Sequence, residues 1–148
     1  MSRGTILLVE DNKDDIALTI RAIKKNKIDN DLVIVHDGAE ALDYLFGAGA
    51  FTGRDARRVP WIILLDLKLP RVDGLQTLAR LRAREQTRLI PVIILSSSNE
   101  ERDVIASYKL GANSFVRKPT DFLEFTRAIE QLHGYWQLNE VAPPGRSS

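Results

Sequence analysis

The chain of 148 residues contains no cysteine. Disulfide bonds, thiolate metal sites and a cysteine nucleophile are therefore excluded, and the composition suits a reducing compartment. Long apolar segments are also missing. No run approaches the roughly 20 residues that span a bilayer, and Met1 to Val9 lacks the apolar region of a secretory signal. We expect a cytoplasmic protein with no membrane partner.

An excess of charge of either sign is absent as well. The chain has 21 basic and 20 acidic residues, a net charge of +1, which gives no broad electrostatic footprint for nucleic acid. The basic segment at residues 47–58 is expected to be a flexible loop with solvated arginines. Length and composition suit one globular domain. We predict a domain over residues 1–136, a tail over 137–148 and no nucleic-acid partner.

The hydrophobic residues that are present fall first into five short runs. Several of these runs show no alternation with polar residues. Such runs are typical of strands that are buried on both faces of a parallel sheet covered by helices. The five runs are Thr5 to Val9, Leu32 to Val35, Trp61 to Leu65, Pro91 to Leu95 and Asn113 to Val116.

Five further segments, each following one run, have the apolar spacing of helices. The alternation of strand and helix predicts an α/β domain with a doubly wound, five-stranded parallel sheet, in which ligands bind at the carboxyl ends of the strands. The apolar positions are Ile16, Ile20 and Ile23; Ala41, Leu42 and Leu45; Leu75, Leu78 and Ala79; Val104, Ile105 and Tyr108; and Phe122, Phe125, Ile129, Leu132 and Trp136.

Residues at the expected helix ends agree with this alternation. Ser98 and Glu101 form a candidate capping box for the fourth helix, which Gly111 can end in a left-handed conformation. Thr120 or Asp121 can cap the fifth helix. The boundaries therefore fit the helices that the apolar spacing predicts.

Residues that can carry out chemistry follow four of the five strands. Glu10 and Asp11 follow the first strand, Asp66 the third and Ser96 the fourth, and Lys118 lies beyond the fifth. Three carboxylates that meet at one sheet edge repel one another unless a cation lies among them. An all-oxygen cluster of this kind suits Mg²⁺ or Mn²⁺.

The same residues suit phosphoryl transfer. A bound Mg²⁺ leaves positions for phosphate oxygens, the lysine adds a positive charge, and the serine hydroxyl can donate to a phosphoryl group. Asp66 can then act as a carboxylate nucleophile and form an acyl phosphate. Taken singly, each residue also has an ordinary role as a helix-start acid, a turn residue, a strand-end hydroxyl or a solvated lysine. Their joint occurrence favours a site.

Four segments resemble the signatures of response regulator receiver domains. They are LLVEDN (Leu7 to Asn12), LLDLKLPRVDG (Leu64 to Gly74), PVIILSSS (Pro91 to Ser98) and the pair Lys118-Pro119. Their order and spacing match that family as well. The resemblance implies a (βα)5 flavodoxin-like fold and a stand-alone signalling protein of a two-component phosphorelay, not an enzyme with its own substrate.

The resemblance also implies which residues hold the phosphoryl group and the metal. Asp66 is the phosphoacceptor. Glu10 and Asp11 are the acidic pair that holds Mg²⁺ or Mn²⁺ together with Asp66. The backbone carbonyl of Lys68 is a further metal ligand.

A conformational switch is implied by the same resemblance. Ser96 is the hydroxyl that moves toward the phosphoryl group, Lys118 pairs with that group, and Phe115 is the aromatic residue that turns inward when Ser96 moves. The fourth helix, fifth strand and fifth helix form the surface that changes. Ser96 and Ser97 stand where threonine and alanine are more frequent in the family, and serine keeps the hydroxyl.

A narrower resemblance lies in the long loop before the third strand, the segment VIASYKLGANSF and the aromatic pair Tyr135-Trp136. These features are similar to those of small response regulators paired with bacterial and cyanobacterial phytochromes. They imply a sensor histidine kinase of the phytochrome type as partner, and a downstream protein or a histidine phosphotransfer protein beyond it. Large apolar residues at Tyr135 and Trp136 also favour a symmetric homodimer.

Two other classes of protein fit parts of the sequence. Phosphatases of the haloacid dehalogenase type also use a strand-end aspartate, but they carry a second aspartate two residues later, where this chain has Lys68. A transcription factor needs a DNA-binding unit, and only about a dozen residues follow the fifth predicted helix. The sequence therefore favours output through protein contacts.

Overall fold

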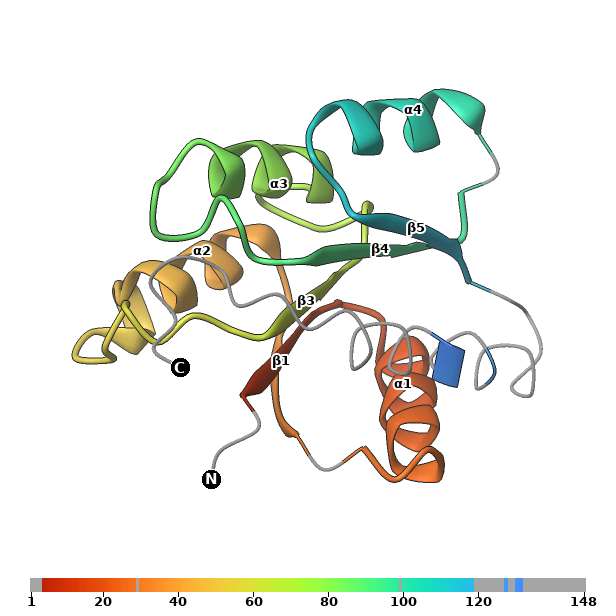
Figure 1. Cartoon of the computed structure of the whole chain (residues 1–148), viewed down its shortest axis with the longest axis horizontal. Helices are drawn as coiled ribbons and strands as arrows, with labels where there is room; N and C mark the ends of the chain where they lie inside the picture. Colours follow the sequence, from red (N-terminus) through yellow and green to blue (C-terminus); the bar gives the residue numbers. More distant parts are fainter. Residues whose placement is uncertain (1–3, 29, 99, 119–126, 128–129, 132–148) are drawn as a thin grey trace.

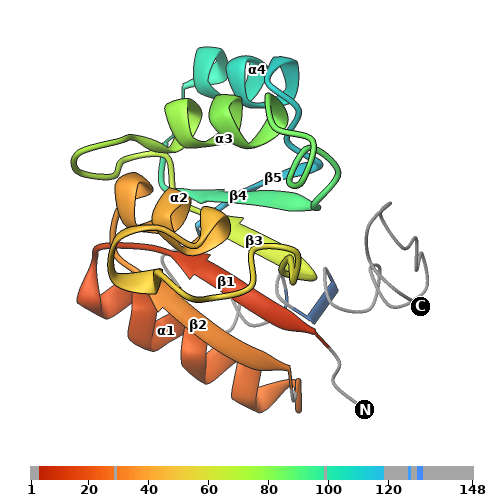
Figure 2. The ribbon, with the colours of Figure 1, turned by 90° about the vertical axis from the view of Figure 1, so that its left-hand side faces the viewer.

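The computed structural model describes residues 4–28, 30–98, 100–118, 127, 130 and 131. Within these residues, five parallel strands form one sheet in the order β2-β1-β3-β4-β5. Helix α1 covers one face of the sheet, and α2, α3 and α4 cover the other (Figures 1 and 2). The elements are β1 (Thr5–Val9), α1 (Lys13–Lys25), β2 (Asp31–Val35), α2 (Gly38–Phe46), the short 3-10 helix η1 (Gly49–Phe51), β3 (Ile62–Leu65), α3 (Gly74–Arg82), β4 (Val92–Ser96), α4 (Glu101–Lys109) and β5 (Ser114–Arg117).

The predicted fold is confirmed, because each strand agrees with its apolar run to within one residue at either end. Alternate side chains of each strand enter different halves of the core. Leu7 and Ile63 pack in the half under α2 and α3, and Leu8 and Leu64 pack in the half under α1. Burial on both faces explains why the strand sequences lack the alternation of a half-exposed sheet.

The start of α4 differs from its prediction. The helix begins at Glu101, and the side chain of the preceding Glu100 makes no capping bond, so the capping box of Ser98 and Glu101 is wrong. The Ser98 hydroxyl accepts from the Glu100 N–H (3.2 Å) and donates to the Asp103 carboxylate (2.5 Å). This local turn delays the first helical residue. Gly111, with φ of 103°, follows the helix end in a positive-φ conformation as predicted.

The apolar spacing in α4 marks the helix but not its buried face. Ile105 and Tyr108 have 46% and 50% of their surface exposed. The buried position belongs to Ser107, whose hydroxyl donates to a backbone carbonyl one turn earlier (2.7 Å). The Tyr108 hydroxyl accepts from the N–H of Phe115 (3.1 Å) in β5, which is the last strand of the sheet.

The loop between α2 and β3 is more ordered than predicted, because Arg54 is not a solvated side chain. Its guanidinium lies 3.9 Å from the ring centre of Tyr44 and donates to the Tyr44 carbonyl (2.9 Å) and to the Arg58 carbonyl. The ring of Phe51 in η1 packs edge-on against Tyr44. The expectation of solvation holds for Arg57 and Arg58, which are exposed.

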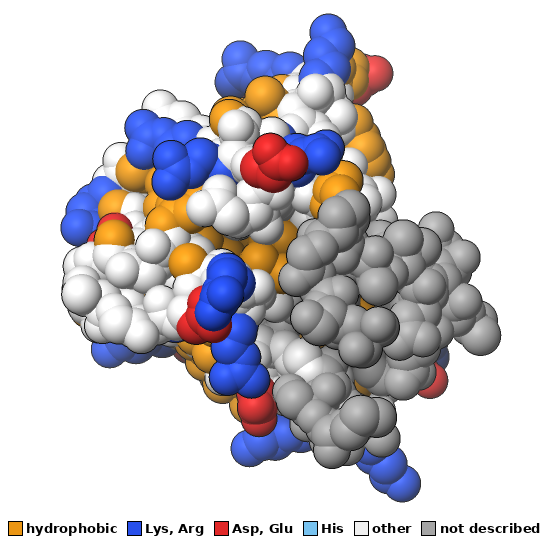
Figure 3. Space-filling view, turned by 60° about the vertical axis from the view of Figure 1, so that its left-hand side comes forward, with side chains coloured by type: hydrophobic (Ala, Val, Ile, Leu, Met, Phe, Trp, Pro, Cys, Tyr) orange, Lys and Arg blue, Asp and Glu red, His pale blue; other side chains and the backbone are white. Residues whose placement is uncertain are grey.

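Charged side chains are spread over the surface. On the face drawn in Figure 3, the Lys and Arg side chains are separated by acidic, polar and hydrophobic ones. None of the helices in the described part of the chain has the length and apolar character that a bilayer-spanning helix requires.

Most of the fifth predicted helix and the tail over 137–148 lie outside the described residues. Residues 127, 130 and 131 are helical. The predictions for Thr120, Asp121, Tyr135 and Trp136 fall outside the described part of the chain.

Candidate functional site

The carboxyl ends of β1 and β3 bring three carboxylates together. The two strands pair with Val9 opposite Leu65, so the residues that follow, Glu10 and Asp66, lie side by side at the sheet edge. The Asp66 N–H donates to the Val9 carbonyl (3.1 Å) and fixes this arrangement. Glu10, Asp11 and Asp66 each offer an oxygen, and the three oxygens lie within 4.8 Å of one another.

These carboxylates range from buried to exposed. Glu10 has 2% and Asp66 9% of its surface exposed, whereas Asp11 is exposed. Buried carboxylates so close together need a compensating positive charge. The exposed position of Asp11 leaves the cluster open on one side, where a cation or a phosphoryl donor can reach it.

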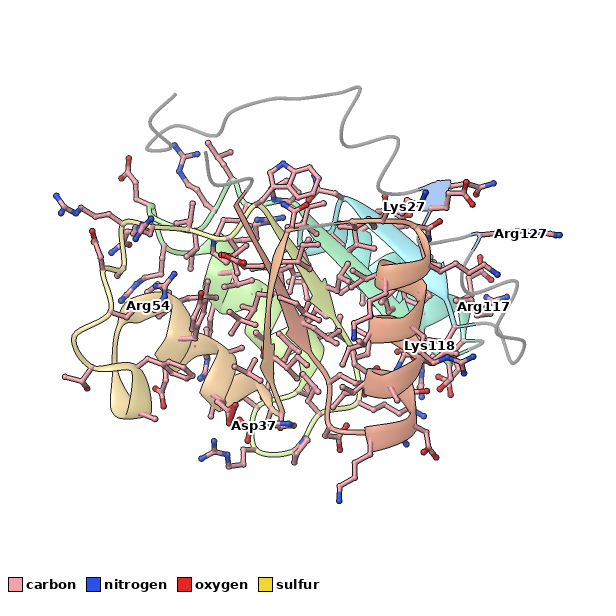
Figure 4. The ribbon with its side chains drawn as sticks, turned by 90° about the horizontal axis from the view of Figure 1, so that it is seen from below. Lys27, Asp37, Arg54, Arg117, Lys118 and Arg127 are labelled. Carbon is pink, nitrogen blue, oxygen red and sulfur yellow. The ribbon has the colours of Figure 1, made fainter. Side chains whose placement is uncertain are left out.

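Lys118 supplies one positive charge directly to this cluster. Its backbone N–H donates to the Ser96 carbonyl (2.8 Å), which places the side chain beside α1 (Figure 4). The ammonium group donates to Glu10, to Asp15 Oδ2 (2.9 Å) and to Asp66 Oδ2 (3.4 Å). The Lys118 side chain is 9% exposed, so solvent screens these ion pairs little.

Burial and charge shift two pKa values at the site. Burial raises the pKa of Glu10 to about 7, against the hydrogen bond from Lys118, which lowers it. Burial lowers the pKa of Lys118, but the hydrogen bond to Glu10 and the charge of Asp66 more than offset that effect, so its pKa is raised. The lysine therefore stays charged at neutral pH.

The loop after Asp66 is tied to the neighbouring strand-to-helix junction. Arg71, in a left-handed conformation with φ of 62°, donates to both oxygens of Asp37 (2.9 and 3.0 Å). Burial raises the pKa of Asp37, but the hydrogen bond and charge of Arg71 and the backbone N–H groups of Glu40 and Ala39 together outweigh burial, so the pKa is lowered. A Cβ on Gly74 would lie 2.2 Å from the Asp66 carbonyl oxygen, so only glycine allows α3 to approach Asp66 this closely.

The predicted switch residues lie at the ends of β4 and in β5. Ser96 has 1% of its surface exposed, and its hydroxyl oxygen accepts from the Ser98 N–H (3.1 Å). Phe115 is half-buried and packs against the core under α2 and α3. Lys68 is exposed, and its N–H donates to Asp66 Oδ1 (3.4 Å).

Comparison with known proteins identifies the family. Residues 6–130 match the response regulator receiver domain, and this match covers every residue of the cluster and all of the sheet except Thr5, the first residue of β1. The chain belongs to the response regulator receiver domain family. In receiver domains, a sensor histidine kinase supplies the phosphoryl group, and an acidic pocket binds Mg²⁺ or Mn²⁺.

The relatives of this receiver domain include response regulators, and two of those described next, RcpA and RtBRR, are linked to phytochromes by name. Response regulator Rcp1 of Synechocystis sp. is 36% identical over 139 residues, which cover 94% of this chain and 92% of Rcp1. The phosphorylated cyanobacterial phytochrome response regulator RcpA superposes with a TM-score of 0.85 at 34% identity, covering 97% of this chain and 99% of RcpA. The bacteriophytochrome response regulator RtBRR has 48% identity and a TM-score of 0.78, covering 98% and 86% of the two chains.

The donor atoms of this receiver domain fit a hard divalent cation. Glu10, Asp11 and Asp66 present carboxylate oxygens only, which is the ligand set that Mg²⁺ and Mn²⁺ prefer. A relative of known structure, the Mn²⁺-bound form of Rcp1, is 35% identical with a TM-score of 0.83, covering 95% of this chain and 99% of that one. The role of the Lys68 carbonyl as a metal ligand stays a prediction.

Sequence reasoning brought Glu10, Asp11, Asp66 and Lys118 to one site, and they lie there together. It missed Asp15, because an acid in the first turn of a helix is ordinary and its neighbour Asp14 has the same charge. No helical spacing linked Asp15 to the acids of the cluster, because Asp11 precedes the N-cap Asn12 and lies outside α1.

Proposed function

We propose that this chain is a stand-alone, cytoplasmic response regulator that accepts a phosphoryl group on Asp66 from a sensor histidine kinase with bound Mg²⁺ or Mn²⁺. The observation that carries the proposal is the Lys118 ammonium placed between Glu10 and Asp66 at the open edge of the sheet. A phosphoaspartate would carry negative charge on its phosphoryl oxygens. A lysine and a metal ion beside a nearly buried carboxylate would stabilise that charge.

In the proposed reaction, an Asp66 carboxylate oxygen attacks the phosphorus of a phosphohistidine. The new O–P bond forms as the N–P bond breaks, and the imidazole nitrogen keeps the electron pair. Lys118 then exchanges a carboxylate partner for a phosphoryl oxygen. Glu10, Asp11, Asp66 and the Lys68 carbonyl would hold the metal, which would neutralise charge on the phosphoryl oxygens.

The proposed output is a shift between two conformations. The Ser96 hydroxyl, which accepts a hydrogen bond in this structure, would turn to donate to the phosphoryl group. Phe115 would turn inward as Ser96 moves and alter the surface of α4 and β5. A phosphoryl group would favour this conformation because it adds acceptor oxygens, beyond those of the carboxylate, to which the Ser96 hydroxyl can donate.

The proposed partners follow from the relatives. RcpA and RtBRR are phytochrome response regulators by name, which supports a phytochrome-type histidine kinase as phosphoryl donor. A downstream protein or a histidine phosphotransfer protein would receive the signal. The alignment with Rcp1 covers 92% of that response regulator, which supports a receiver function for this chain.

The phosphoacceptor is tested by intact-mass measurement after incubation with acetyl phosphate and Mg²⁺. The native protein gains one base-labile phosphoryl group, and Asp66→Asn and a chelated native sample gain none. A native protein that stays unmodified under conditions that modify a known receiver domain would contradict the proposed chemistry. Hydrolysis of a phosphomonoester by the native protein would support the phosphatase alternative instead.

We also propose a symmetric homodimer in which Tyr135 and Trp136 take part. Light scattering at increasing concentration, with and without phosphorylation, measures the mass of the particle. The expected result is a mass of twice the 16.7 kDa chain, and Trp136→Ala shifts the equilibrium toward monomer. A monomer under every condition rules the dimer out.

A further inference from the structure

Lys118 has three carboxylate partners, and they are not equivalent. Glu10 and Asp66 belong to the cluster of oxygens that can hold a cation, and Asp15 does not. Asp15 Oδ2 accepts from Lys118 Nζ at 2.9 Å, outside the group of oxygens that can hold the cation. The lysine is therefore shared between a metal-binding region and one acid outside it.

A divalent cation held by Glu10, Asp11 and Asp66 would disturb this arrangement. It would engage carboxylate oxygens that now accept from Lys118 and would add two positive charges near the ammonium. Repulsion between cations at short range is strong where water is excluded, and the lysine side chain is 9% exposed. The ammonium then needs an anionic partner that the metal does not use.

Asp15 has the position that this role requires. The first turn of α1 fixes its backbone, because the Asp15 N–H donates to Asn12 Oδ1 (2.9 Å) and its carbonyl accepts from the Thr19 hydroxyl (2.8 Å). Its side chain is 36% exposed, so keeping its charge costs little desolvation. It can hold the ammonium without entering the metal's coordination sphere.

We propose that Asp15 is a positioning residue that retains Lys118 when Glu10 and Asp66 bind the metal, so that metal and lysine occupy the site together. This inference rests on the metal site of the proposed function. It assigns to α1 a part in the chemistry, in addition to covering the sheet. Loss of Asp15 leaves Lys118 to compete with the metal for Glu10 and Asp66.

The test is Mn²⁺ affinity of the unphosphorylated protein, measured by electron paramagnetic resonance of free Mn²⁺. Asp15→Asn is expected to weaken binding by about tenfold, as a broken short-range coupling does. The matched control is Asp14→Asn, which removes the same charge from an exposed neighbour in the same turn and is expected to weaken binding less than about twofold, as a screened surface charge does. Thermal unfolding without metal checks that each variant is folded.

The coupling to lysine is tested by repeating Asp15→Asn in a Lys118→Met background. If Asp15 acts through Lys118, the second substitution changes Mn²⁺ affinity less than about twofold there, because the two substitutions are then not additive. An equal loss in both backgrounds, or an equal loss in Asp14→Asn, overturns the inference and leaves the proposed function intact. A native protein that binds no Mn²⁺ overturns both.

Discussion

Glu10 is the most buried carboxylate of the cluster, and its protonation links the site to stability. Burial raises its pKa from 4.5 to about 7 in the folded protein, so between these values the folded state binds a proton that the unfolded state has lost. Stability therefore falls as pH rises from about 4.5 to about 7 in the absence of metal. In the metal-free protein, ionisation of Glu10 therefore lowers the free energy of unfolding.

Glu10→Gln should remove this pH dependence. Denaturant unfolding in a chelator at pH 5 and pH 8 should show the variant gaining stability relative to the native protein by on the order of 2 kcal/mol toward the higher pH. The comparison cancels other titrating groups, which both proteins share. A stability difference that is the same at both pH values would show that Glu10 titrates normally.

At the scale of the elements, the helix α3 is joined to two loops by one side chain. Arg82 donates to the carbonyls of Gly111, Arg88 and Ile90 at 2.8–3.0 Å and to Asn113 Oδ1 at 3.0 Å. Burial lowers the pKa of its guanidinium. These bonds fix the segments that precede β4 and β5, at the sheet edge opposite the carboxylates.

Arg82→Met should therefore destabilise the fold and leave the chemistry in place. The partly buried carbonyls of Gly111 and Ile90 lose their donor, which costs about 2–4 kcal/mol, while the site lies at the other end of the strands. Chemical denaturation measures the loss, and acetyl phosphate labelling checks the site in the folded variant. Arg80→Met, at an exposed position of the same helix, is the control and should change stability little.

At the scale of the whole molecule, metal binding and folding are linked because the cluster exists only in the folded chain. Mg²⁺ at about one hundred times its dissociation constant should add about 2.7 kcal/mol to stability. Calorimetry with and without Mg²⁺ measures this as a rise in melting temperature. Asp11→Asn, which alters an exposed member of the cluster, should melt normally without metal and gain less from Mg²⁺.

The sequence predicted what depends on strand order and missed what depends on side-chain direction. The run Thr5–Val9 forms β1 as predicted, and a parallel sheet then requires Glu10 and Asp66 to meet. Nothing in the spacing showed that Arg54 lies over the Tyr44 ring rather than in water. Contacts of this kind depend on how loops fold back, and local patterns carry no information on that.

The same limit applies to α4 and α1. The spacing of Ile105 and Tyr108 is helical, but both are exposed, because the buried side of a helix depends on what covers it. Asp14 and Asp15 are identical in type and adjacent in sequence, and it is the contact with the Lys118 ammonium that sets Asp15 apart. In both helices, contacts made in the folded protein determine which side chains are buried or paired, and the local sequence does not.

The ion pair between Glu10 and Lys118 joins residues that are 108 positions apart in the sequence. This separation determines when the ion pair can form during synthesis of the chain. On the ribosome, Asp66 and its acidic neighbours are made long before the lysine. Because β5 is the last strand of the sheet to be translated and lies at its margin, the cluster gains its lysine only near the end of the domain. An unfinished chain therefore holds the carboxylates without the ammonium that contacts Glu10, Asp15 and Asp66.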